Sequence, residues 1–237
     1  MADTMESNLV AEGRGRMRDL QVILVDLDDT IYPREQGIMK EVGRRMLRYM
    51  VERVHIPEDE APVLRRRYFE AYGTTLRGLQ MHHQVDPEDY LQFVHDIPLD
   101  QFLHPNPHLD QALGRIPQKK VIFTNATAEH AEGVLRRVGV RHHFAQIIDL
   151  RALRYVNKPD PEAYRRALEL VAAPAEACLL VEDSLRNLLP ASHLGMATIL
   201  VSSDTDGNDG ADLTIANLVE LPQAVAFLQG HNPVRKD

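Results

Sequence analysis

The sequence of 237 residues contains no tryptophan and only one cysteine, and aromatic side chains make up 5% of it. Hydrophobic residues still reach 44%, so the chain can bury a core that aliphatic side chains must mostly fill. A single thiol cannot form an internal disulfide, which fits a reducing compartment. Because Cys178 lies in an apolar run, we expect it to be a buried small hydrophobe rather than a nucleophile.

Positive charge is also scarce. The 27 lysines and arginines are outnumbered by 35 aspartates and glutamates, which gives a formal net charge of -8. Nucleic acids and anionic membranes attract basic surfaces, so this charge argues against both as partners. No segment approaches the length of a membrane span, and residues 1–19 lack the apolar centre of a signal peptide. We therefore expect a cytoplasmic protein, monomeric or homodimeric, whose partner is a small molecule.

Short aliphatic runs alternate with amphipathic helical patterns from residue 20 onward. Strands are expected at residues 22–25, 121–123, 146–148, 179–181 and 198–201. Helices are expected at residues 129–138, 161–171, 185–193 and 218–228. This alternation predicts right-handed crossovers and an α/β fold with a doubly wound, Rossmann-like parallel sheet covered on both faces. Ligands of such sheets bind at the carboxyl ends of the strands.

One region interrupts the alternation. Residues 35–103 show no strand pattern, whereas apolar residues recur at helical spacing over residues 38–54, 61–72 and 87–94. We interpret this region as a small helical domain inserted after the first strand. The α/β core would then comprise residues 20–34 and 104–237, and residues 1–19 would form a flexible tail.

Four polar stretches lie at or just after the ends of predicted strands. They are Asp-Leu-Asp-Asp-Thr at residues 26–30, Thr124-Asn125, Lys158-Pro159, and Glu182-Asp183-Ser184. A parallel sheet brings the carboxyl ends of its strands to one edge, so we expect these stretches to converge. Each stretch alone is a weak signal, because a single Asp-x-Asp is often a solvated loop and Thr-Asn is often a helix cap. The complete set in this order is specific.

The set resembles the motifs of the haloacid dehalogenase-like hydrolase superfamily, whose phosphatase members carry Asp-x-Asp-x-Thr first. The resemblance implies that Asp26 is the nucleophile, which forms an aspartyl-phosphate intermediate that water then hydrolyses. It implies that Asp28 protonates the leaving oxygen and then acts as the base for that water. Halide leaves without a proton, and the dehalogenase branch lacks an aspartate at the position of Asp28, so phosphate-ester chemistry fits better.

The other motifs receive supporting roles from the same resemblance. Thr124 would donate its hydroxyl to a phosphoryl oxygen, with backbone or side-chain donors of Asn125 nearby to bind the substrate. The ammonium of Lys158 would lie between Asp26 and the transferring group and offset the charge that develops there.

The crowding of carboxylates is explained if the site holds Mg²⁺. The resemblance implies an octahedral oxygen site formed by the side chains of Asp26 and Asp183 and the backbone carbonyl of Asp28. The metal would neutralise the carboxylates and polarise the phosphate. Glu182 would bind the metal through a water molecule or support the residues that ligate it directly. We interpret Asp29 as a residue that caps a turn or supports the ligands.

Three features favour the pyrimidine 5′-nucleotidase branch of the superfamily. The stretches at residues 28–33 and 72–79 are similar to sequences of that group, and Asp29 and Asn187 replace glycines that many relatives carry. The helical insertion resembles the cap that these enzymes close over the substrate. In a glycine-flanked loop of the insertion, Tyr72 and Arg77 are expected to bind a base or ribose, and two neighbouring histidines, His82 and His83, are weaker candidates.

The last motif runs into a predicted helix. Ser184 is expected to cap that helix, and Asn187, one turn later, to face back and anchor the metal-binding loop.

Other functions stay open on the sequence alone. A sugar-phosphate or phosphoglycolate phosphatase, or a phosphomutase, would use the same motifs, because fold does not fix function. A non-catalytic nucleotide-binding module would not need the nucleophile. The sequence therefore predicts a Mg²⁺-dependent phosphatase of small monoesters, with nucleoside 5′-monophosphates as the expected substrates.

Overall fold

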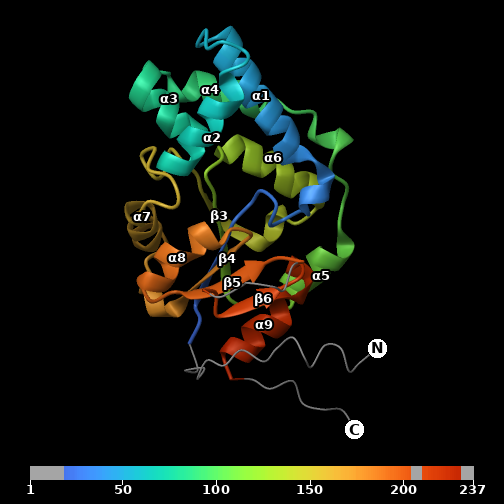
Figure 1. The fold of residues 1–237 in the computed structure, drawn as a ribbon. Helices are drawn as coiled ribbons and strands as arrows, with labels where there is room; N and C mark the ends of the chain where they lie inside the picture. The colour runs from blue at the N-terminus through green and yellow to red at the C-terminus, as the bar shows by residue number, and fades with distance from the viewer. Residues whose placement is uncertain (1–18, 204–209, 231–237) are drawn as a thin grey trace.

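The computed structural model of the chain describes residues 19–203 and 210–230. Its centre is a parallel sheet of six strands in the order β3-β2-β1-β4-β5-β6 (Figure 1). The strands are β1 Val22–Val25, β2 Lys119–Phe123, β3 Phe144–Ile148, β4 Cys178–Glu182, β5 Ala197–Val201 and β6 Leu213–Ile215. The expected tail, apart from Asp19, lies outside the described residues.

Helices cover both faces of the sheet. They are α5 Pro107–Gly114, α6 Ala128–Val138, α7 Pro161–Val171, α8 Leu185–His193 and α9 Leu221–Leu228. Successive residues of β1 point to opposite faces: Ile23 belongs to the cluster packed under α5, α6 and α9, whereas Leu24 belongs to the cluster under α7 and α8. The predicted doubly wound α/β fold is confirmed. Cys178 is buried, and burial raises the pKa of its thiol to about 11, as expected for a structural cysteine.

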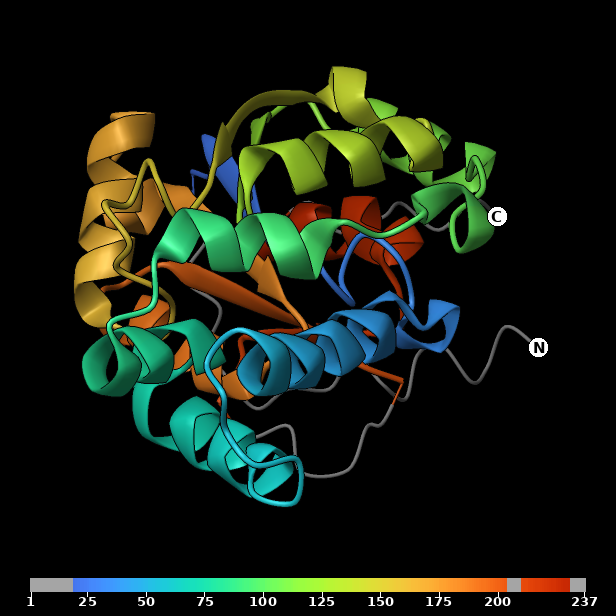
Figure 2. The same ribbon diagram turned by 90° about the horizontal axis from the view of Figure 1, so that it is seen from above.

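Five α-helices lie between β1 and β2 in the chain, and we call the first four of them the helical insertion. They are α1 Ile38–Glu52, α2 Ala61–Tyr72, α3 Thr75–His83 and α4 Pro87–His95. Figure 1 shows them as a separate layer to one side of the sheet, and Figure 2 shows α1 to α4 spread across that side. They share a hydrophobic cluster centred on buried side chains such as Met50, Leu79 and Tyr90. None of the helices in the described ranges has the length and apolarity that a membrane span requires.

The stretch that we expected to be a loop in the insertion is helical, so that prediction was wrong. Thr74 caps α3 by accepting a hydrogen bond from the backbone N–H of Arg77 at 3.2 Å. Gly78 lies against the ring of Tyr68, where an added Cβ would come within 2.2 Å of the ring carbon Cγ. Thr74 therefore starts the helix, and the glycine that suggested a loop lets α2 and α3 pack closely.

Two further elements lacked a recognisable pattern in the sequence. They are α5, which is capped by the side chain of Asn106, and β6, which has only three residues. The start of β2 was also missed because it carries two lysines, of which Lys120 is buried and donates to the backbone carbonyls of Ile116 and Gln118.

The strand order places the functional site. From β1 the chain proceeds outward to β2 and β3 on one side and then returns to β4, β5 and β6 on the other. The crossovers after β1 and β4 therefore leave in opposite directions, which opens a crevice beyond the carboxyl ends of these two strands. Asp26 follows β1 directly, and Glu182 ends β4.

Candidate active site

A lysine and two carboxylates form a buried cluster at this crevice. Lys158 donates from Nζ to Oδ1 of Asp26 and to Oε2 of Glu182, both at 2.6 Å. The lysine follows β3 in the chain, so three separate segments meet there. All three residues are buried. The structure thus brings together the nucleophile and the lysine that the sequence predicted, and it places Glu182 in direct contact with the lysine.

The cluster carries more negative than positive charge. Burial raises the pKa of Asp26 to about 7, with the charge of Glu182 adding to the shift. Burial likewise raises the pKa of Glu182 to about 7. For Lys158 burial acts to lower the pKa, but the two carboxylates outweigh it and the ammonium form persists. One ammonium shared by two buried carboxylates leaves the site able to accept another cation.

Carboxylate oxygens of Asp26, Glu182 and Asp183 lie within 4.8 Å of one another. Mg²⁺ prefers oxygen ligands, and it is usually held by one or two carboxylates together with substrate phosphate and water. This donor set therefore fits magnesium. A second possible ligand group, Asp110 with His142 and His143, lies near the amino ends of β2 and β3, away from the crevice.

An arginine that the sequence did not single out lies over the acidic cluster. The guanidinium of Arg34 is 3.2 Å from Oδ2 of Asp29 and 3.4 Å from Oδ2 of Asp183. Its side chain is 77% exposed, so these ion pairs stabilise the fold little. Asp29 has a positive φ of 59°, and its carboxylate pairs with Arg34.

Asp28 has two partners. Its Oδ1 accepts a hydrogen bond from the Tyr32 hydroxyl at 2.5 Å and lies 3.1 Å from Nε2 of His130. Burial acts to raise the pKa of Asp28, but the interactions with His130 and Tyr32 outweigh it, so the pKa lies below its ordinary value. His130 was missed by the sequence analysis because its position in a helical pattern gives no sign of the contact with Asp28.

Of the two residues that follow β2, the second holds the loop that carries Lys158. Thr124 is buried, and its Oγ1 accepts the backbone N–H of Ala126 at 3.0 Å. Asn125 accepts the backbone N–H of Lys158 at 2.8 Å and donates to its carbonyl at 3.0 Å. Both the oxygen and the nitrogen of the Asn125 side-chain amide are thereby used to position Lys158. Only the backbone of Asn125 is left for the substrate contact that we predicted.

The helical insertion reaches the lysine loop at the turn between α2 and α3. Gly73 has φ +84°, and an added Cβ would lie 2.5 Å from Cδ of Pro159, so only glycine fits there. Asn157 donates from its amide to the carbonyl of Tyr72 at 3.1 Å. Tyr72 thus adjoins the lysine loop, while its hydroxyl pairs with His82 at 2.8 Å.

The remaining residues of the predicted substrate loop lie farther along α3. Arg77 is exposed on this helix, and His83 pairs with the Tyr68 hydroxyl at 2.8 Å. No hydrogen bond joins these side chains to the acidic cluster within the part of the chain that the structure describes.

A second attachment of the insertion depends on ion pairs. Arg151, which follows β3, contacts the carboxylates of Glu88 in α4 and Glu129 in α6, with shortest separations of 2.7 Å to each. The Tyr155 hydroxyl also donates to Glu88. Arg151 therefore links α4 of the insertion to α6, which covers the sheet.

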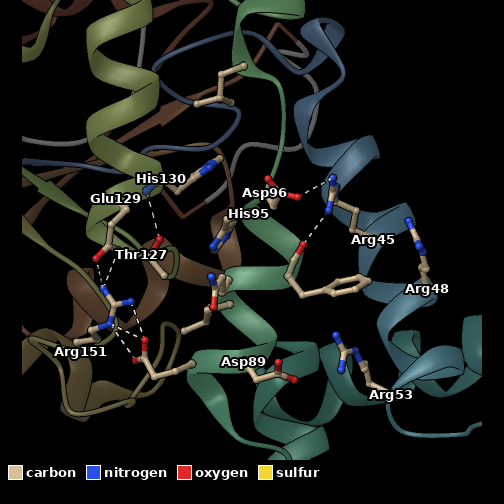
Figure 3. Close-up of a pocket in the computed structure, with 15 residues that line it drawn as sticks. Arg45, Arg48, Arg53, Asp89, His95, Asp96, Thr127, Glu129, His130 and Arg151 are labelled. Atoms are coloured by element: carbon tan, nitrogen blue, oxygen red, sulfur yellow. Dashed lines mark hydrogen bonds and ion pairs between the residues drawn. The ribbon is translucent and has the colours of Figure 1, made fainter.

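A cavity of about 870 Å³ lies between α1, α4 and α6 (Figure 3). Arg45 and Arg48 come from α1, His95 from α4, and Glu129 and His130 from α6. The carboxylate cluster does not line this cavity. His130 lines it and also contacts Asp28, so this residue links the wall of the cavity to the first motif.

The helix that follows the last motif departs from expectation at its start. Ser184 occupies the N-cap position of α8, but its side chain makes no capping hydrogen bond, so that part of the prediction was wrong. The carbonyl of Asn187 accepts the Tyr164 hydroxyl at 2.6 Å. The anchoring role expected for the Asn187 amide stays a prediction.

Replacing Glu182 by glutamine should stabilise the metal-free protein at pH 8 but not at pH 5. The pKa of Glu182 is near 4.5 in the unfolded chain and about 7 in the folded protein. Such a carboxyl lowers the unfolding free energy of the protein progressively as the pH rises from the first value to the second. Glutamine avoids that loss, and we expect a gain in unfolding free energy at pH 8 of at most roughly 3 kcal/mol. Urea unfolding in EDTA at both pH values measures it. An equal effect of Glu182→Gln at both pH values would contradict the raised pKa.

Comparison with known proteins agrees with this geometry. A profile of the family described as haloacid dehalogenase-like hydrolase matches residues 20–195. Phosphate metabolism protein 8 of Saccharomyces cerevisiae is 24% identical over 195 residues, which cover 76% of this chain and 61% of the yeast protein. The chain thus spans about three fifths of the length of this curated relative.

The fold is shared with solved structures, among them two from Thermococcus onnurineus and Bacillus subtilis. The HAD phosphatase of Thermococcus onnurineus superposes with a TM-score of 0.58 and 20% identity, covering 87% of this chain and 98% of its own. The HAD-hydrolase YfnB of Bacillus subtilis, bound to magnesium, gives a TM-score of 0.56 and 19% identity, covering 88% and 99%.

Proposed function

Because the chain belongs to the haloacid dehalogenase-like hydrolase family, we propose that it is a magnesium-dependent phosphatase of small phosphate monoesters. The observation that carries the proposal is the second carboxylate of the first motif. Asp28 stands two residues after Asp26 and is held by Tyr32 and His130. A phosphate ester that releases an alkoxide needs a proton donor at this place, whereas halide release does not.

The reaction would proceed in two displacements. Asp26 attacks phosphorus, the ester oxygen takes a proton from Asp28, and an aspartyl-phosphate remains. Asp28, now a carboxylate, removes a proton from the water that attacks this intermediate and releases inorganic phosphate. Its lowered pKa suits the second step. For the first step, the negative charge of the bound phosphate favours the protonated form of Asp28.

The other residues of the site stabilise the transferring phosphoryl group. Lys158 keeps its ammonium against Asp26 and offsets the negative charge, and Thr124 would donate to an equatorial oxygen. Magnesium, held by carboxylates of Asp26 and Asp183 and the carbonyl of Asp28, would polarise the phosphate and neutralise its charge. Glu182 supports the site by its contact with Lys158.

We further propose that the preferred substrates are nucleoside 5′-monophosphates, as in pyrimidine 5′-nucleotidases. The helical insertion would act as the cap that selects the leaving group. Tyr72 supports this proposal, since its backbone contacts Asn157 next to Lys158 and its ring belongs to an aromatic group with Tyr68 and His82. Such a group is suited to contact a base or ribose. The name of the yeast relative, a phosphate metabolism protein, is in keeping with phosphate release.

The proposal predicts phosphate release that depends on metal. Uridine and cytidine 5′-monophosphates should give higher kcat/KM than adenosine 5′-monophosphate, glucose 6-phosphate or phosphoglycolate. Treatment with EDTA should lower the rate by roughly 10²-fold or more, and added Mg²⁺ should restore it. A colorimetric assay of inorganic phosphate across this panel measures both effects.

The outcomes separate the two parts of the proposal. A preference for glucose 6-phosphate or phosphoglycolate would overturn the substrate assignment and leave the chemistry intact. Release of no phosphate from any ester would overturn the phosphatase and favour a non-catalytic nucleotide-binding module.

A further inference from the structure

Two histidines meet beside Asp28, one from each layer of the molecule. His130 in α6 places Nε2 3.1 Å from Oδ1 of Asp28. The ring of His130 stacks on the ring of His95, the last residue of α4, with centroids 4.5 Å apart and an interplanar angle of 23°. Figure 3 shows the two rings next to each other between α4 and α6. Asp28 is therefore connected to the helical insertion through His130.

The local structure holds His130 in place. It lies in the first turn of α6, where its backbone N–H donates to Oγ1 of the N-cap residue Thr127 at 3.2 Å. This helix follows the loop after β2, so the segment that carries Thr124 to the crevice also carries His130. The His130 side chain has no exposed surface. Its ring can therefore move only if the packing around it changes.

The stacked pair has few other polar contacts. Nδ1 of neither His95 nor His130 has a hydrogen-bond partner among residues 19–203 and 210–230. Burial lowers the pKa of His95 to about 3, with the nearby His130 adding to the shift, so the His95 ring is neutral near pH 7. A neutral ring can pack on His130 without charge repulsion. The one polar contact of the His130 ring in this part of the chain is thus with Asp28.

The contact fixes the direction of the Asp28 carboxylate. An ionised carboxylate only accepts hydrogen bonds, so His130 donates from Nε2. The Tyr32 hydroxyl donates to the same oxygen, Oδ1, at 2.5 Å. With both donors on Oδ1, the other oxygen of Asp28 is the one available for proton transfer to the ester.

We propose that His130 is a positioning residue for Asp28, and that His95 completes this arrangement from the helical insertion. The general acid is then oriented for proton transfer only while the insertion lies against α6. The inference rests on the proposed phosphatase function and makes it more specific. Esters that release an alkoxide, such as nucleotides, need this orientation, whereas activated aryl phosphates do not.

The two kinds of ester therefore provide the test. Dinitrophenolate leaves without a proton, so its departure does not depend on Asp28. The parameter kcat/KM reports the steps up to departure of the leaving group and so isolates the acid step from the later attack of water. A general loss of structure would lower kcat/KM for both esters, whereas loss of orientation would lower it for the nucleotide alone.

The experiment compares uridine 5′-monophosphate with 2,4-dinitrophenyl phosphate in the presence of Mg²⁺. His130→Leu should lower kcat/KM for the nucleotide by roughly 10²-fold and for the aryl ester by less than about threefold. His130→Gln retains an N–H donor and should recover most of the nucleotide activity. His95→Ala should show the same selective loss at roughly tenfold, and His95→Phe, which preserves the stacked ring, should stay near the parent. Asp28→Asn gives the maximum loss.

Equal losses on both esters, or a glutamine variant as defective as leucine, would overturn the inference. If circular dichroism shows that His130→Leu does not fold, His95→Ala and His95→Phe provide the same test. His95 is only partly buried, so these changes disturb the packing less. The parent protein serves as the reference for the function itself. Its failure to cleave both esters would overturn the phosphatase proposal whatever the histidine variants do.

Discussion

Replacing Asp26 by asparagine is expected to abolish phosphate release, with kcat falling by about 10⁴-fold or more. The amide has nearly the same shape but is not a nucleophile, so the first displacement cannot occur. The fold should persist, because the exchange removes one of the carboxylates whose burial opposes ionisation. The measurement is phosphate release from uridine 5′-monophosphate in Mg²⁺, with thermal unfolding to confirm the fold.

A labelling experiment makes the same prediction more direct. Acid quenching of turnover with a ³²P-labelled nucleotide should leave hydroxylamine-sensitive label on the parent and none on Asp26→Asn. Asp29→Asn is the matched control, since it makes the same chemical change three residues away at a carboxylate paired with Arg34. It should lose less than about tenfold in rate, because an exposed ion pair stabilises the site little. Equal turnover by parent and Asp26→Asn would reject the nucleophile assignment.

Replacing Lys158 by methionine should destabilise the protein and nearly abolish its activity. Methionine fills a similar volume but leaves two ionised carboxylates without their shared cation. Removing one partner of such a buried pair costs about 3–5 kcal/mol of unfolding free energy. Loss of a cation at the transferring phosphoryl group should lower kcat by roughly 10²–10³-fold.

The stability loss should depend on pH. Asp26 and Glu182 have folded-state pKa values of about 7 even with the lysine present. At pH 5 both are protonated and no longer need the cation, so the loss should be largest at pH 8 and small at pH 5. Urea unfolding in EDTA at both values measures it.

Lys120→Met is the matched control for this change, because Lys120 is also buried but donates only to backbone carbonyls. The change in unfolding free energy caused by Lys120→Met should be the same at pH 5 and pH 8, because no carboxylate pairs with this lysine. The kcat of Lys120→Met should equal that of the parent. A Lys158→Met protein as stable as the parent at pH 8 would show that the ion pairs do not form.

The convergence of the motifs could be predicted because it follows from topology. Once the alternation of strands and helices indicated a parallel sheet, residues after β1 and β4 had to meet at one edge. The contact of Lys158 with Asp26 required one more step, which came from the resemblance to a family. Neither step depends on the rotamer of a side chain.

The residues that were missed depend on tertiary contacts. His130 lies where a helical pattern expects a residue of the first turn, and nothing near it in the sequence refers to Asp28, which is 102 residues away. In the sequence nothing distinguishes Arg34 from other exposed arginines, because its contact with Asp183 forms only in the folded protein. The helix α3 was mistaken for a loop because Gly78 was interpreted by its backbone freedom, whereas here it makes room for the ring of Tyr68.

Two of the contacts that attach the helical insertion, at Arg151 and at Gly73, differ in their response to ionic strength. Arg151 joins it to α6 through ionised groups that are partly exposed, and salt weakens such pairs as the Debye length falls from about 10 Å at 0.1 M to about 3 Å at 1 M. At Gly73 the attachment consists of close backbone packing and an amide hydrogen bond, which screening leaves unchanged. Concentrated salt would therefore weaken the contact at Arg151 and leave the one at Gly73 in place.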